Sequence, residues 1–105
     1  MLRDTVTIGD LSMDYCTFGS GARTLVILPG VSLNKVSGQV QSIAQQYALF
    51  EKDFTPYLFD RKNDFKAPYS VEEMAEDTAR AMQALGLGAS YVMGLSQGGS
   101  IAQEL

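Results

Sequence analysis

The segment Gly94-Leu95-Ser96-Gln97-Gly98 combines residue types and spacing that could do chemistry, because it matches the pattern G-x-S-x-G. It lies between a short apolar stretch and a stretch with helical periodicity, so the serine is expected at a sharp turn from a strand to a helix. Glycines two residues before and after the serine avoid a clash between a Cβ and the nearby backbone, and Gly99 leaves further room. The pattern therefore predicts that Ser96 is an exposed nucleophile.

A helix that starts directly after Ser96 would support the same chemistry. The first amides of a helix lack partners within it, and the positive end of the helix dipole favours negative charge there. A developing oxyanion would be stabilised at such a place. The alternative is a serine in a glycine-rich turn that has no chemistry. The strand before the motif, the helix after it and the alternating elements upstream favour the nucleophile.

Composition excludes several other classes of function. The chain has 105 residues, of which 46% are hydrophobic and 19% charged, as in a small folded domain. Its net charge of −4, without a basic cluster, argues against binding to nucleic acid or to an anionic membrane surface. The single cysteine, Cys16, excludes an internal disulfide and a cysteine-rich zinc site. The chain has no histidine, which removes histidine–metal sites and any histidine base within it. No metal or organic cofactor is expected.

Periodicity in the sequence predicts alternating strands and helices. Strands are expected at residues 4–8, 11–18, 24–28, 54–59 and 90–93, the first two joined as a hairpin through Gly9-Asp10. Helices are expected at residues 34–51, from a Ser70–Glu73 capping box to a stop at Gly86, and at residues 97–105. Residues 60–68 are expected to form a polar loop. The order predicts an α/β fold, a three-layer αβα sandwich around a mostly parallel sheet.

Four segments give the chain a resemblance to the esterase-like members of the α/β-hydrolase family. They are Leu28-Pro29-Gly30-Val31, Asp60-Arg61, residues 69–77 and residues 94–103. The resemblance covers nearly the whole chain and corresponds to the first half of that fold. It implies that residues 1–105 are the N-terminal portion of a single α/β-hydrolase domain. This portion would end in the helix after the nucleophile elbow, which is the turn around Ser96.

The resemblance also implies roles for individual residues. Ser96 would be the nucleophile, and the backbone amides of Val31 and Gln97 would form the oxyanion hole. The glycines that shape the elbow would be Gly94, Gly98 and Gly99. Pro29 stands where the family often has a histidine. The family's acid and catalytic histidine follow the nucleophile in the chain, and neither is among these 105 residues. We therefore do not expect these residues alone to be a competent serine hydrolase, whereas a complete domain would be one.

The function expected of a complete domain is hydrolysis of a carboxylic ester through an acyl-enzyme on Ser96, with a small-molecule ester or acyl substrate. One alternative is another hydrolase chemistry on the same scaffold, such as thioester, amide or carbon–carbon cleavage. The other is a short non-catalytic α/β module used for binding or interaction.

The sequence also bears on location and association. A cytoplasmic location is expected, because the chain shows no signal peptide, no apolar run long enough to span a bilayer and only one thiol. A chain that stops at Leu105 is expected to self-associate through the strand from Ser90 to Met93, which would be left as an apolar sheet edge.

Overall fold

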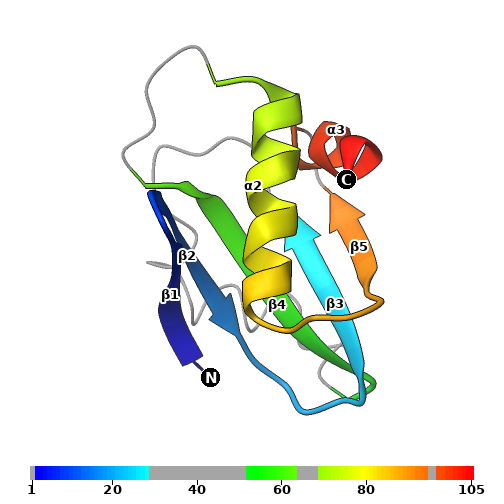
Figure 1. Cartoon of the computed structure of the whole chain (residues 1–105). Helices are drawn as coiled ribbons and strands as arrows, with labels where there is room; N and C mark the ends of the chain where they lie inside the picture. Colours follow the sequence, from blue (N-terminus) through cyan, green and yellow to red (C-terminus); the bar gives the residue numbers. More distant parts are fainter. Residues whose placement is uncertain (1, 29–51, 64–68, 95–96) are drawn as a thin grey trace.

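The computed structural model describes residues 2–28, 52–63, 69–94 and 97–105 (Figure 1). In chain order the elements are β1 (Leu2–Ile8), β2 (Leu11–Thr17), β3 (Arg23–Leu28), β4 (Phe54–Lys62), α2 (Val71–Ala84), β5 (Tyr91–Gly94) and α3 (Gln97–Glu104). Five predicted strands and two predicted helices are thereby confirmed. The helix predicted at residues 34–51 lies outside the described residues.

The strands form one sheet in the order β1-β2-β4-β3-β5. The hairpin of β1 and β2 is confirmed, with Ile8 opposite Leu11 across the turn at Gly9 and Asp10. β2 also pairs antiparallel with β4, whereas β3 pairs parallel with both β4 and β5. The carboxyl ends of β3, β4 and β5 consequently lie at the same edge of the sheet.

Strand β4 differs from its prediction, because it continues through Lys62 where a polar loop was expected to begin at Asp60. Pairing with β2 explains the extension: Met13 lies opposite Lys62 past an irregularity in the register, and the Asn63 amide donates to the Ser12 carbonyl at 2.7 Å. A partner strand supplies the hydrogen bonds that make an extended backbone favourable even for a polar sequence.

Pro56 lies inside β4 although proline cannot donate to a ladder. The carbonyl of Pro56 accepts a hydrogen bond from the Phe18 amide at 3.4 Å. Pro56 therefore faces the residue just after β2 on this side of its strand. The β2–β4 pairs end at Thr17 and Tyr57. Pro56 thus lies just beyond the last β2–β4 pair, where its missing N–H removes no hydrogen bond between paired residues of these two strands.

Both faces of the sheet are buried. Helices α2 and α3 lie side by side on one face (Figure 1). On that face the core consists of Val6, Leu11, Met13, Tyr15, Val26, Leu28, Phe59, Met74, Ala75, Ala81 and Ile101. The opposite face buries Cys16, Phe18, Leu25, Ile27 and Leu58. Burial on both faces is what a parallel sheet in a layered α/β fold requires, and the α/β fold class is confirmed.

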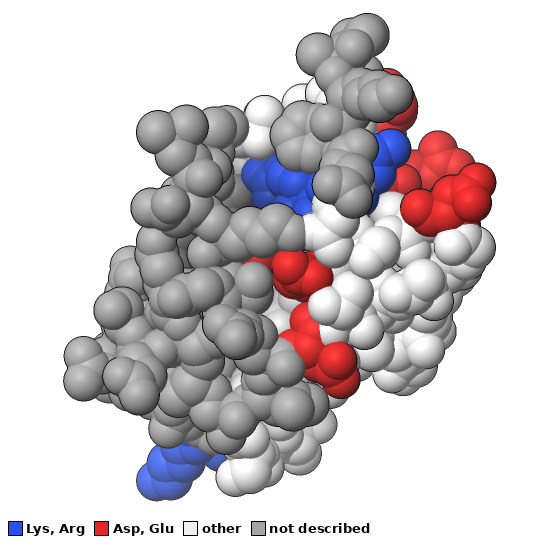
Figure 2. Space-filling view, turned by 90° about the vertical axis from the view of Figure 1, so that its left-hand side faces the viewer, with Lys and Arg blue, Asp and Glu red and all other residues white. Residues whose placement is uncertain are grey.

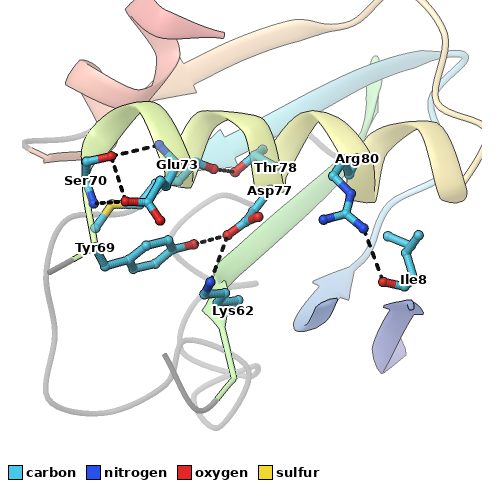
Figure 3. A network of polar contacts seen from close by, with 9 residues as sticks. Ile8, Lys62, Tyr69, Ser70, Glu73, Asp77, Thr78 and Arg80 are labelled. Atoms are coloured by element: carbon cyan, nitrogen blue, oxygen red, sulfur yellow. Dashed lines mark hydrogen bonds and ion pairs between the residues drawn. The ribbon is translucent and has the colours of Figure 1, made fainter. Parts of the chain in front are cut away.

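The ends of α2 are set by local sequence. The Ser70 hydroxyl accepts from the Glu73 amide at 3.1 Å, while the Glu73 carboxylate accepts from the Ser70 amide at 3.3 Å (Figure 3). At the other end Gly86 has φ of +70°, and the Gly86 and Leu87 amides donate to the last turn of the helix. A side chain at Gly86 would strain this left-handed conformation. The predicted capping box and glycine stop are confirmed.

Candidate active site

The predicted motif lies at the edge where the parallel strands end. Gly94 is the last residue of β5, and Gln97 is the first residue of α3. The first amides of α3 have no partner within the helix. Two residues predicted for the site, Ser96 and Val31, lie outside the described residues, as does Pro29.

Gly94 packs directly against the first turn of α3. A Cβ built on Gly94 would lie 2.6 Å from the Gly99 Cα and 2.5 Å from the Gly98 carbonyl carbon. Both atoms belong to backbone, so the contact cannot be relieved by moving a side chain. Gly98 is itself buried. The absence of a side chain at Gly94 is therefore what allows β5 and α3 to approach.

Gly99 is under a weaker constraint. A Cβ there would lie 3.7 Å from the Gly94 carbonyl oxygen, which is an ordinary van der Waals contact. The close approach thus depends on the glycine at the end of the strand, whereas Gly99 has room for a methyl group.

Arg61 reaches this part of the molecule from β4. One terminal nitrogen of its guanidinium donates a hydrogen bond to the Gln97 side-chain oxygen at 3.1 Å. Burial lowers the pKa of Arg61, while the neighbouring Tyr69 and Asp60 oppose that shift. Sequence reasoning noted Arg61 only as part of the Asp60-Arg61 segment. It missed the contact, because no local spacing relates the two residues.

A second polar cluster ties the end of β4 to α2 (Figure 3). The Tyr69 hydroxyl donates to the Asp77 carboxylate at 2.5 Å, and Lys62 Nζ lies 3.9 Å from the same carboxylate oxygen. Lys62 also lies 4.8 Å from the centre of the Tyr69 ring. Burial, followed by the hydrogen bond to Asp77, raises the pKa of Tyr69, so the phenol stays protonated and remains a donor.

Cys16 offers no chemistry to the site. It lies within β2 and is fully buried. Burial, with a smaller contribution from the charge of Asp60, raises the pKa of the Cys16 thiol to about 11. A buried neutral thiol is not a nucleophile, so Cys16 packs as a small core residue.

Charged side chains of both signs lie on the described part of the chain. On the face shown in Figure 2, basic side chains lie beside acidic ones. Among the described residues no group of three or more His, Cys, Asp or Glu side chains is arranged to hold a metal ion. No helix in that same part is long and apolar enough to cross a bilayer.

Comparison with known proteins gives the fold a name. No family model matches the sequence. A curated relative, 3-oxoadipate enol-lactonase 2 of Acinetobacter baylyi, is 24% identical over 108 residues, an alignment that covers 98% of this chain and 39% of the relative.

Solved structures also superpose on nearly the whole of this chain. A putative α/β hydrolase from Nostoc superposes with a TM-score of 0.78 and 23% identity, covering 99% of this chain and 37% of its own. The N-acyl homoserine lactonase AidH superposes with a TM-score of 0.80 and 20% identity, covering 99% of this chain and 40% of its own. The chain thus has a partial α/β-hydrolase fold and spans about two fifths of the length of these proteins.

Proposed function

We propose that these residues form the nucleophile-bearing part of a single hydrolase domain that cleaves carboxylic esters through an acyl-enzyme on Ser96. The observation that carries the proposal is the contact of Gly94 with the backbone of Gly98 and Gly99. This contact brings the end of β5 against the first turn of α3, and only one short segment, which contains Ser96, joins the two elements. A serine at such a turn has its hydroxyl exposed above the sheet.

In the proposed reaction, the Ser96 oxygen attacks the ester carbonyl and transfers its proton to a general base. The carbonyl oxygen becomes an oxyanion, which accepts hydrogen bonds from the backbone amides of Gln97 and Val31. Collapse of this intermediate expels the alcohol, which takes the proton from the base, and water then hydrolyses the acyl-enzyme. The 105 residues contain no histidine, so a histidine base would come from outside them. Without it, only about 10³–10⁴-fold acceleration over water would remain.

The substrate class is supported by the names of similar proteins. The curated relative is an enol-lactonase, and one similar structure is an N-acyl homoserine lactonase. A lactone is a cyclic carboxylic ester, so both names describe the same bond. We infer a small-molecule ester or lactone as substrate, and thioester, amide or carbon–carbon cleavage as the competing chemistries. The proposed cytoplasmic location is supported by the single, buried thiol of Cys16.

The test replaces the nucleophile in a protein that carries this sequence together with its general base. Ser96→Ala should abolish hydrolysis of a nitrophenyl ester and of a simple lactone while leaving the far-UV circular dichroism and the melting temperature unchanged. Ser100→Ala is the matched control, because Ser100 is an exposed serine in α3. Turnover by Ser96→Ala equal to that of the parent would exclude the acyl-enzyme. A panel of thioesters and amides would separate the competing chemistries.

A second candidate is association through β5, which would suit a non-catalytic binding module. In the described part of the sheet, β5 is an edge strand that pairs with β3 alone. Tyr91 and Val92 on this strand are 57% and 39% exposed. An exposed apolar edge strand recruits other strands. We propose that a chain limited to residues 1–105 self-associates there.

A further inference from the structure

The hydrogen bond between Arg61 and Gln97 joins two elements that are not neighbours in the sheet. Strands β4 and β5 lie on opposite sides of β3, and all three run parallel. Leu58 of β4 pairs with Ile27, and Gly94 of β5 pairs with Leu28. Arg61 and Gln97 each follow these pairs by three residues. Their 3.1 Å hydrogen bond therefore crosses the carboxyl end of β3.

The donor side of this bond is well anchored. Arg61 belongs to β4, which lies between β2 and β3 in the sheet. Its side chain is half-buried, so the guanidinium has restricted freedom. A hydrogen bond from a charged guanidinium is stronger than one between neutral groups. Arg61 can thus hold its acceptor in one place.

The acceptor of this bond belongs to Gln97, whose backbone N–H is one of the two proposed oxyanion donors. Gln97 is the first residue of α3, where the backbone has hydrogen-bonding support on only one side. The side chain and the backbone amide of Gln97 are attached to the same Cα, so a displacement of that Cα moves the amide and strains the side-chain contact. Anchoring the side-chain oxygen to β4 therefore opposes a shift of the Gln97 backbone and of its N–H away from this edge of the sheet.

We propose that Arg61 is a positioning residue, which holds Gln97 so that its backbone N–H points at the oxyanion of the acyl-transfer step. This inference rests on the function proposed above. Arg61 acts through Gln97 and does not touch the reacting atoms. Misplacement of an oxyanion donor weakens the interaction in the transition state more than in the ground state, so its effect falls on kcat rather than on KM.

The test measures steady-state kinetics of Arg61→Met, Gln97→Leu and the double variant in the protein with its general base. Each single variant should lower kcat by about 10- to 100-fold, with KM changed by less than about threefold. The double variant should be no slower than the slower single variant, because both break the same contact. Arg61→Lys, which keeps a cation at this position, should recover part of kcat.

Arg80→Met is the matched control. Arg80 also donates through its guanidinium, to the Ile8 carbonyl at 3.4 Å, but it is exposed and belongs to α2. This variant should keep kcat within about twofold of the parent. Labelling with ¹⁵N-glutamine gives a readout without activity. The side-chain and backbone resonances of Gln97 should shift in Arg61→Met and stay in place in Arg80→Met.

Three results would overturn the inference while leaving the nucleophile intact. The first is a kcat for Arg61→Met within twofold of the parent when Ser96→Ala is inactive. The second is a double variant whose loss is the product of the two single losses. The third is an unchanged Gln97 spectrum in Arg61→Met. If Ser96→Ala keeps its turnover, the proposed function fails, and the oxyanion role of Gln97 fails with it.

Discussion

The contact between β5 and α3 can be tested with a pair of glycine substitutions, Gly94→Ala and Gly99→Ala. The two sites lie against each other and would receive the same methyl group. At Gly94 that group would lie 2.6 Å from the Gly99 Cα, well inside van der Waals contact. At Gly99 it would lie 3.7 Å from the Gly94 carbonyl oxygen, which is a normal separation. We therefore expect Gly94→Ala to lower the free energy of unfolding and Gly99→Ala to leave it unchanged or raise it.

The magnitudes follow from these distances. Forcing a methyl group into a packed contact costs about 1–3 kcal/mol, and backbone neighbours place Gly94→Ala at the upper end of that range or beyond. Alanine is favoured over glycine in a helix by about 1 kcal/mol, so Gly99→Ala should be neutral or stabilising by up to that amount. Each kcal/mol shifts the melting temperature by roughly 4–8 °C in a domain of about 100 residues and by roughly 2–4 °C in one of about 150–250 residues.

Urea and thermal unfolding followed by far-UV circular dichroism measure both effects, and the chain has no tryptophan to serve as a fluorescent probe. In an active protein Gly94→Ala should also lower kcat, because α3 must move away from β5 and carries Gln97 with it. If Gly94→Ala is as stable as Gly99→Ala, then β5 and α3 are not as close as described. The argument for an elbow at Ser96 would then lose its main support.

Two further predictions concern Cys16 and the β5 edge. The thiol has a pKa near 9.0 in an unfolded chain and about 11 in the folded protein, so the unfolded state loses this proton first as the pH rises. Stability should therefore fall by about 2 kcal/mol between pH 9 and 11; Cys16→Ala should remove that part of the slope, and equal slopes for the two proteins in urea unfolding would contradict the prediction. A chain of residues 1–105 should be dimeric or larger in solution scattering, with Tyr91→Lys and Val92→Lys shifting it toward monomer. A monomer with cooperative unfolding and a protected Tyr91 amide would show instead that the chain closes this edge by itself.

The sequence alone determined the features that depend on neighbours along the chain. Ser70 and Glu73 are three residues apart and form the cap of α2, and Gly86 supplies the left-handed conformation that ends it. The turn at Gly9 joins β1 to β2. The position of Gly94 before a serine predicted a close approach of strand and helix, because the motif itself implies the turn.

Tertiary structure decided the features that depend on residues far apart in the chain. No strand is predicted from the polar residues Asp60, Arg61 and Lys62. They nevertheless belong to β4, because β2 pairs with this strand across the sheet. Arg61 and Gln97 are 36 residues apart, and only the sheet order brings them within 3.1 Å. Local spacing carries no information about such a pair. Its hydrogen bond depends on which strands lie on either side of β3, and pairing across the whole sheet determines that order.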